Sequence, residues 1–223
     1  MGLIANLLYI LGIGVVIMIT LNIINVLQAG SKKPDGRTME QILGKKPEKA
    51  TYEDMERLSR SEKMQLFYAA STPELNEFNG EYQAKLLSGG VLGGSSAFFT
   101  HHVFPYGKLT LNTKWVGKGF QSTGANSGIG YNIFTQQNGR TLRIRIIDTS
   151  MVPTKIGKDG KRSFQINYSR LNSGMIHSMR DEVRKINNNL YIGAGYMGLG
   201  GGSMNPAPFA LIGPPKPWVG ADK

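Results

Sequence analysis

The acids and arginines best placed to act together in a reaction lie close to one another late in the chain. Asp181 and Glu182 stand between Arg180 and Arg184, and Asp148 precedes them. Two carboxylates could transfer protons, but no nucleophile and no base with an orienting partner accompanies these residues. Ion pairs, exposed or buried, are the simplest interpretation, and capture of a ligand carboxylate by Arg180 or Arg184 is the alternative. The sequence therefore predicts a binding protein and not an enzyme.

Histidine and cysteine show no pattern typical of a metal site. His101 and His102 are adjacent, so on a strand they would face opposite sides, and His177 is remote in sequence. The chain has no cysteine, which excludes a disulfide scaffold and a thiolate-bound zinc or iron–sulfur centre. No His-Glu-x-x-His motif occurs. We expect neither a metal ion nor another cofactor.

Aromatic side chains recur from residue 82 onward and are candidates for the lining of a binding cavity. An aromatic-lined pocket would suit a fatty acyl, isoprenoid, sterol-like or pigment molecule. The alternative is a filled core without a cavity. The candidate lining residues are Tyr82, Trp115, Phe120, Phe134, Phe164, Tyr168, Tyr191 and Tyr196.

The elements that must position these side chains are short β-type runs separated by Gly, Asn, Asp and Pro. Asn138-Gly139 and Asp159-Gly160 are typical of hairpin turns. About eight antiparallel strands joined by tight turns favour a mainly β fold, either a barrel or a sandwich. The absence of an immunoglobulin-type Cys…Trp…Cys spacing favours the barrel. We expect strands at Glu81–Leu87, Lys114–Phe120, Gly130–Thr135, Thr141–Asp148, Ser163–Arg170, Met179–Ile186, Leu190–Tyr196 and Phe209–Ile212.

Two of these runs show a clear period of two, which predicts one dry face and one wet face for each. In the first, Leu142, Ile144 and Ile146 alternate with Arg143 and Arg145. In the second, Phe164, Ile166 and Tyr168 alternate with Gln165, Asn167 and Ser169.

Two glycine-rich stretches, Gly89–Ser96 and Gly193–Gly202, interrupt the strand pattern. No Gly-Lys-Ser/Thr follows either stretch, so we predict no phosphate loop. The first is expected to be a plain loop or a flexible lid. Glycines in the second are expected to permit close backbone contacts within a small barrel.

Several short motifs lie in a characteristic order between Pro73 and Gly195. They are Phe78-Asn79-Gly80-Glu81-Tyr82, Trp115-Val116-Gly117-Lys118-Gly119-Phe120, Gly124-Ala125-Asn126, Met179-Arg180-Asp181-Glu182-Val183-Arg184-Lys185-Ile186 and Leu190-Tyr191-Ile192-Gly193. This order resembles lipocalin-like (calycin-type) bacterial barrel families. The resemblance implies an antiparallel barrel with an internal apolar cavity and a non-enzymatic binding role. It does not cover the N-terminal helix or the C-terminal tail.

The N-terminal segment is uncharged from Leu3 to Ala29. As a helix it would be ~40 Å long, enough to cross a hydrocarbon core of ~30 Å. A signal peptide is the rival interpretation, but no Lys or Arg precedes the apolar run, which is longer than such peptides need. We predict a single transmembrane helix that contacts the lipid bilayer through residues 3–29.

The residues that flank this helix predict its orientation. Lys32, Lys33 and Arg37 are the first of several basic residues on its C-terminal side. The positive-inside rule then places the C-terminal domain in the cytoplasm, at a bacterial-type inner membrane. Asn22 and Asn25 would lie at the lipid headgroups or contact another integral membrane protein.

The remaining boundaries follow from composition. A basic linker is expected at 30–50, with a possible helical turn at Met39–Leu43, followed by a helical segment at 51–78. Within that segment we predict one helix over Thr51–Ala70, with Thr51 as its N-cap. The barrel is expected at 79–213, and a Pro-rich tail at 214–223 offers Pro214, Pro215 and Trp218 for partner contact.

The net charge of +11 is spread along the chain outside the N-terminal helix. No nucleic-acid recognition motif accompanies it, so attraction to an anionic membrane surface is the simpler explanation. The leading hypothesis is a membrane-anchored, non-catalytic barrel that binds a hydrophobic or amphipathic small molecule. The alternative is an accessory subunit of a larger integral-membrane complex, respiratory or photosynthetic in type, with the helix docked on the core and the barrel capping it.

Overall fold

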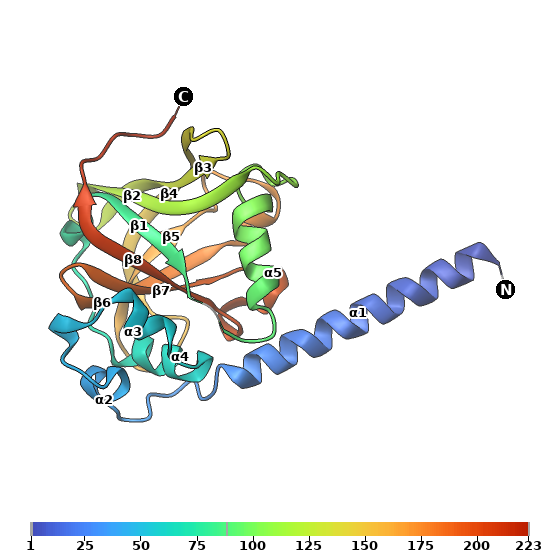
Figure 1. Cartoon of the computed structure of the whole chain (residues 1–223), viewed down its shortest axis with the longest axis horizontal. Coiled ribbons are helices and arrows are strands. Elements are labelled where there is room, and N and C mark those ends of the chain that lie inside the picture. The colour runs from blue at the N-terminus through green and yellow to red at the C-terminus, as the bar shows by residue number, and fades with distance from the viewer. Residues whose placement is uncertain (1, 88, 223) are drawn as a thin grey trace.

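The structure is a computed structural model that describes residues 2–87 and 89–222. Eight strands form a closed barrel in which each strand is antiparallel to the next and β8 returns to pair with β1 (Figure 1). The predicted antiparallel barrel of about eight strands is therefore confirmed. The strands are β1 (Gly80–Leu86), β2 (Thr113–Gly124), β3 (Ser127–Gln136), β4 (Thr141–Pro153), β5 (Arg162–Asn167), β6 (Arg180–Asn187), β7 (Leu190–Tyr196) and β8 (Ala207–Lys216).

Each strand overlaps the segment predicted for it, and the differences lie at the ends. Gly139 and Gly160 have φ of +81° and +70°, and they lie in the turns that join β3 to β4 and β4 to β5. The largest difference is in β8. It continues to Lys216, so the first prolines of the expected tail belong to the barrel.

The alternation predicted for β4 is wrong at Ile146. This side chain is 40% exposed, whereas Ile147 is fully buried. The β3–β4 register is irregular between Ile144 and Ile147, and Arg145 within this interval has a φ of +58°. The bulge adds one residue to β4 and thereby turns the following side chains to the opposite faces.

Residues 51–70, predicted as one helix, form two helices, α3 (Tyr52–Glu56) and α4 (Arg60–Ala69). Thr51 is the N-cap of α3 as predicted, and in the capping box it forms with Asp54 its backbone N donates to Asp54 Oδ2 at 2.9 Å. Ser59 and Glu62 form a second capping box at the start of α4. An N-cap residue has non-helical backbone angles, so this second box interrupts the predicted helix.

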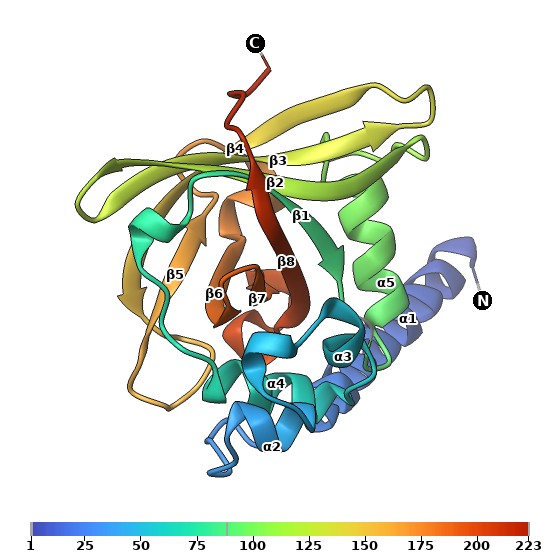
Figure 2. The same ribbon diagram turned by 60° about the vertical axis from the view of Figure 1, so that its left-hand side comes forward.

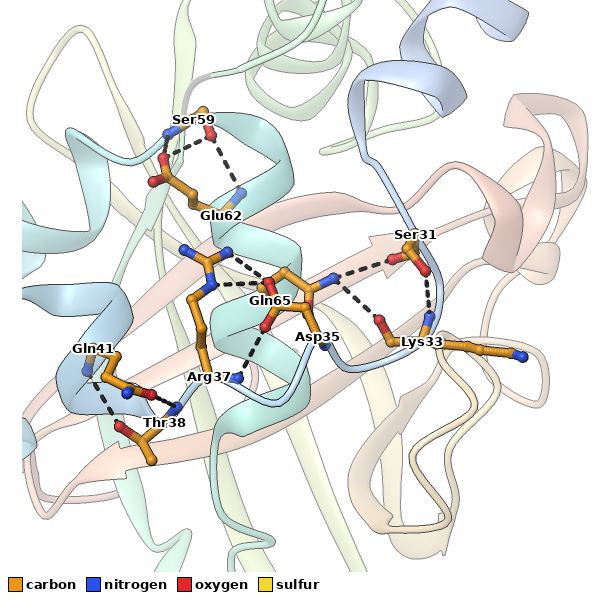
Figure 3. A network of polar contacts seen from close by, with 9 residues as sticks. All are labelled: Ser31, Lys33, Asp35, Arg37, Thr38, Gln41, Ser59, Glu62 and Gln65. Carbon is orange, nitrogen blue, oxygen red and sulfur yellow. Dashed lines mark hydrogen bonds and ion pairs between the residues drawn. The ribbon is translucent and has the colours of Figure 1, made fainter.

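The segment 30–50, predicted as a basic linker, packs against α4 (Figure 3). Gln65 Nε2 donates to Ser31 O at 3.4 Å and to Lys33 O at 3.2 Å. Its Oε1 accepts from Asp35 N at 2.9 Å. A buried side chain of α4 therefore holds three points of this segment, which is not an extended solvated tether.

The apolar core has two parts. One cluster fills the barrel interior, and the other lies between the outer face of β7 and β8 and the helices α2 (Met39–Leu43), α3 and α4. Alternate residues of β7 serve the two clusters: Tyr191 points inward, whereas Leu190 and Ile192 point outward. The helices therefore stabilise one side of the barrel from outside.

The first glycine-rich stretch, expected as a loop or lid, leads into helix α5 (Gly93–Phe98) and a π-helical segment, η3 (Phe99–Val103). His101 and His102 consequently lie on a helix and not on a strand. Glycine favours helices weakly, but Phe104, just after η3, is buried in the barrel core and this packing holds the segment in place. Figures 1 and 2 both show α5 beside the C-terminal part of α1.

The N-terminal helix α1 (Leu3–Gln28) projects away from the barrel (Figure 1). Its candidate membrane span, Ile4–Gln28, has a mean hydropathy of 2.6 in its most apolar window, and no residue of that window is buried. The helix is long and apolar enough to cross a membrane, and a signal sequence has the same properties. The other short helices are η1 (Pro47–Lys49), η2 (Leu75–Glu77), η4 (Gly174–Ser178), η5 (Gly198–Gly200) and η6 (Gly202–Met204).

Candidate functional site

Most of the aromatic residues predicted to line a cavity lie inside the barrel, where their rings pack against one another. The ring centroids of Phe78 and Phe164 are 4.0 Å apart, and those of Phe78 and Tyr191 are 4.8 Å apart. The Phe120 ring lies 5.3 Å from that of Phe164. This part of the interior is a filled aromatic core. The predicted residues within it are Tyr82, Trp115, Phe120, Phe134, Phe164, Tyr168 and Tyr191.

A polar cluster is buried beside this core, and we call its four residues the Lys118 cluster. Lys118 Nζ lies 2.9 Å from Asp181 Oδ2, and it donates to Tyr168 OH at 2.5 Å and to Asn132 Oδ1 at 2.7 Å. The Tyr168 hydroxyl in turn donates to Asp181 Oδ2 at 2.8 Å. None of the four residues is more than 3% exposed. The buried cation and carboxylate are thus paired and hydrogen-bonded, as charges in an apolar interior must be.

Burial changes the ionisation of this cluster. Desolvation lowers the pKa of Lys118 below its usual value, although the nearby Asp181 carboxylate opposes the shift. Desolvation also raises the pKa of Tyr168 well above its usual value. The amine is fully engaged by its oxygen partners, and neither of the cavities described below is lined by Lys118. We therefore assign the cluster a structural role in joining β2, β3 and β6 to the residue that follows β5.

Trp115 connects the Lys118 cluster to the mouth of the barrel, which is the end where β1 finishes and β2 and β8 begin. Its indole Nε1 donates to Asn132 Oδ1 at 3.2 Å, and its ring centroid lies 5.3 Å from Lys118 Nζ. Its backbone N donates to His101 Nδ1 at 3.1 Å. Trp115 therefore separates the filled interior from the space at the mouth.

A cavity of about 580 Å³ lies at this mouth. The end of β1, the start of β2 and the start of β8 form one side, and α5 with η3 forms another. Asn25 near the end of α1 and residues of α3 and α4 complete it. The volume is within the range of small-molecule sites. Its apolar and aromatic lining includes Tyr52, Ala84, Leu86, Leu87, Leu92, Ala97 and Trp115.

The cavity is also basic. Arg60, Lys85, Lys114 and His101 line it, and none of its described lining residues is an acid. Lys85 Nζ lies 4.4 Å from the ring centroid of Tyr52. A mainly apolar lining that also carries cations is suited to an amphipathic molecule with a negative head.

Among the residues that line the cavity, His101 is the one whose side-chain type ordinarily titrates in the physiological pH range. Burial lowers its pKa, and electrostatic interaction with the neighbouring His102 and Lys114 lowers it further. Its Nδ1 accepts a hydrogen bond from Trp115 N, so protonation at that nitrogen would break the bond. His101 is consequently neutral at neutral pH and takes up a proton only under more acidic conditions.

A group of hydrogen bonds, here called the polar latch, fixes the end of α1 beside the cavity. Arg60 Nε donates to Asn25 O at 3.0 Å, and Arg60 Nη2 donates to Asn205 Oδ1 at 3.0 Å. Asn25 Nδ2 donates to the same Asn205 oxygen at 2.6 Å, and Asn205 Nδ2 donates to Asn22 Oδ1 at 3.0 Å. The two asparagines predicted for partner contact thus bind groups of their own chain.

The other predicted ligand-binding residues lie outside the interior. Tyr196 packs on the outer cluster, and its hydroxyl donates to Glu182 Oε1 at 3.3 Å. Arg184 also faces outward; its Nη2 lies 3.1 Å from Asp159 Oδ2, and its side chain is fully buried. Arg180 donates to backbone carbonyls at the mouth end of β6. Because β6 alternates, the inward positions between Arg180 and Arg184 belong to Asp181 and Val183.

The C-terminal tail starts at the end opposite the mouth and folds back along the outside of its own barrel, where Asp222 N donates to Arg143 O at 2.9 Å. The ring centroids of Trp218 and Tyr131 are 4.6 Å apart, and Val219 N donates to Tyr131 OH at 3.3 Å. Pro215 and Trp218 help to line a second cavity of about 340 Å³, and both Pro214 and Pro215 lie in β8. The tail residues predicted for partner contact therefore contact this chain's own strands.

From the sequence we predicted Trp115 as a binding residue. The other members of the mouth cavity that carry basic side chains were missed, namely Arg60, Lys85, Lys114 and His101. These four come from α4, β1, β2 and η3, which are far apart in sequence, and no local spacing connects them. One signal was available. The stretch 91–111 contains no acid, and basic residues stand on both sides of it.

No protein-family model matches the chain. No curated protein matches it. Among solved structures, the chain is similar to a protein from Thermomonospora curvata, with 14% identity, a TM-score of 0.45, and coverage of 66% of this chain and 82% of that one. The chain is thus assigned to no family.

Proposed function

We propose that this protein is a membrane-anchored, non-catalytic barrel whose mouth cavity binds the negative head of an amphipathic lipid. The apolar helix α1 is retained and crosses the bilayer. Ligand binding takes place at the mouth and not inside the barrel, because the interior is filled with aromatic rings. The motif order from Pro73 to Gly195 supports placing the barrel among lipocalin-like binding proteins.

The observation that carries this proposal is the position of the cavity. Its lining includes both Asn25, near the end of the apolar helix α1, and the basic residues Lys85 and Lys114 at the mouth of the barrel. A lipid is the ligand class already present where α1 enters the membrane. Its charged head would meet Lys85 and Lys114, and its chain would contact the apolar lining.

A lipid-occupancy measurement tests the proposal. The full chain is extracted from membranes in mild detergent and analysed by native mass spectrometry with added phosphatidylglycerol. Each lysine is expected to contribute about 1 kcal/mol to the binding of the anionic lipid. The double variant Lys85→Ala with Lys114→Ala should therefore bind the lipid about 2 kcal/mol, or about 30-fold, more weakly. The control is Lys158→Ala, because Lys158 is exposed in the β4–β5 turn at the opposite end of the barrel.

Equal lipid occupancy in the double variant and the control would rule out the mouth cavity as the lipid site. A wild-type chain that carries no lipid but retains a stoichiometric protein partner would favour the accessory-subunit alternative.

We propose further that the barrel lies in the cytoplasm, at a bacterial-type inner membrane. The support is the basic character of residues 32–49, which follow α1 directly. Protease added to sealed inside-out vesicles should cleave the barrel, whereas right-side-out vesicles should protect it. The reverse pattern would place the barrel on the other side.

A further inference from the structure

We infer that the mouth of the barrel is itself embedded in the lipid headgroup region, through a set of exposed apolar side chains that we call the apolar rim. The inference rests on the proposed membrane insertion of α1 and adds a second membrane contact made by the barrel. The rim residues are Val91, Phe98, Tyr106, Leu109, Leu111, Leu171, Met175, Leu199 and Met204, all at least 40% exposed.

The topology places these residues at one end of the barrel. They lie in the β1–β2, β5–β6 and β7–β8 connections. In a barrel of successive antiparallel strands, alternate connections share an end, so these three meet at the mouth. Outside α1, the only other exposed large apolar side chains among the described residues are Ile146 and Val219. Outside α1, the exposed large apolar side chains of the described residues therefore gather at one end of the barrel.

Hydrogen bonds tie the rim connections to one another. Arg145 Nε donates to Phe104 O at 2.9 Å in the first connection, and Arg145 Nη1 donates to Asn172 Oδ1 at 3.4 Å in the second. Gly198 N of the third connection donates to Ser178 Oγ of the second at 3.3 Å. The three connections therefore form one continuous surface.

The same surface is joined to the membrane helix. Val91 N donates to Gln28 Oε1 at 2.8 Å, and Leu92 N donates to Asn25 Oδ1 at 3.3 Å. Asn205, at the end of the third connection, donates to Asn22 at 3.0 Å. Figure 1 shows α1 leaving the barrel on the side that carries α5. A helix that enters the bilayer at this point brings the adjoining rim to the bilayer surface.

The charge of the rim fits a lipid surface. The segments 91–111, 171–179 and 197–205 contain no Asp or Glu, and Lys108 is their only Lys or Arg. Lys114 and Arg180 lie at the adjoining strand ends. Apolar side chains bounded by cations and free of acids are the composition expected at an anionic lipid interface. With the rim in the headgroups, the mouth cavity opens toward the bilayer, and its ligand enters from the membrane without crossing water.

The absence of native cysteine allows a direct test, because single cysteines can be introduced into the full chain and labelled with an environment-sensitive fluorophore. Leu111→Cys reports on the rim, and Val219→Cys is its matched control, since these side chains are 63% and 62% exposed. Val15→Cys reports on the insertion of α1. Each labelled protein is reconstituted into vesicles of zwitterionic and anionic phospholipid that carry a nitroxide quencher high on the acyl chain.

The expected result is strong quenching and a blue shift of the label at residue 111, with neither change at residue 219. Equal behaviour of these two labels, together with insertion at residue 15, would overturn the rim inference and leave the anchored barrel in place. A label at residue 15 that stays in water would overturn both. As a second test, Leu109→Glu with Leu111→Glu should reduce quenching of a label at residue 98, whereas Val219→Glu should not; unchanged quenching in the double variant would contradict the inference.

Discussion

Lys118 is a charged residue inside the barrel, where three aromatic rings surround its amine. Its Nζ lies within 5.6 Å of the ring centroids of Trp115, Tyr168 and Phe209, and its one carboxylate partner is Asp181. Removing only the lysine leaves a buried carboxylate without its cation. We therefore predict that Lys118→Met lowers the free energy of unfolding by about 3–5 kcal/mol. Urea unfolding followed by circular dichroism measures this change.

The matched variant removes both charges. Lys118→Met with Asp181→Asn should be more stable than Lys118→Met alone, because no buried charge then lacks its partner. Tyr168 can still donate to the amide oxygen that replaces the carboxylate. If the double variant is less stable than the single one, the ion pair is not the reason for the loss.

His101 should make the stability of the protein depend on pH. Its pKa in the folded state is lowered by burial and by electrostatic interaction with His102 and Lys114, so below the unfolded value of 6.5 the unfolded chain binds more protons than the folded chain. The free energy of unfolding therefore falls as the pH decreases from 6.5 through the folded-state pKa. His101→Gln, which cannot titrate and keeps an acceptor for Trp115 N, should weaken this fall.

Urea unfolding at about pH 7.5 and about pH 5.5 compares the two chains across the range in which histidine titrates. The acids contribute equally to both, so the difference between the slopes isolates His101. Identical slopes would mean that His101 keeps an ordinary pKa.

At the scale of elements, the glycine-rich β7 segment tests how closely neighbouring strands approach. A Cβ atom at Gly193 would overlap the ring of Phe209 on β8, whereas one at Gly200 would lie 3.9 Å from its nearest neighbour. We predict that Gly193→Ala destabilises the barrel by about 1–3 kcal/mol, because the ring must move within a packed core. Gly200→Ala should change stability by less than about 0.5 kcal/mol. Thermal unfolding of the two variants measures this difference. Equal melting temperatures would show that the Phe209 ring can move aside without cost.

The strands were predictable because period-two patterns and glycine turns are local signals. Asn138-Gly139 marks the β3–β4 turn correctly, and Leu190–Tyr196 is predicted to the residue. The failures have non-local causes. The bulge at Arg145 is held by carbonyl groups of residues 104 and 105, and no pattern within β4 reveals them. Likewise, α5 forms from a glycine-rich sequence of weak helix propensity, and the residue that anchors this segment in the barrel core is Phe104, further along the chain.

At the scale of the whole molecule, the sequence predicts the parts better than their arrangement. The apolar helix and the barrel could each be identified from their own residues. The cavity between them could not, because it needs Asn25, Arg60 and Trp115 to meet, and these belong to three distant segments. The polar latch has the same origin: Asn205 follows the glycine-rich stretch Gly193–Gly202, and its neighbours in sequence do not indicate a role for it.

The latch predicts that α1 and the barrel move as one body. Arg60 and Asn25 are both nearly buried where the helix meets the mouth, and each charged hydrogen bond of Arg60 contributes about 1.5–3 kcal/mol. Spin labels at Val15→Cys and Lys158→Cys in the full chain should therefore give a narrow distance distribution by pulsed electron paramagnetic resonance. Asn205→Ala should broaden it, because α1 loses the side chain that joins Asn22, Asn25 and Arg60.

Arg140→Ala is the control for this measurement, because Arg140 is an exposed residue of the β3–β4 turn, at the mouth end of the barrel where the polar latch also lies. It should leave the distribution narrow. A broad distribution in the unaltered chain would show that the latch does not hold the helix. The mouth cavity would then lack its wall at Asn25, and the binding site proposed between helix and barrel would have no fixed shape.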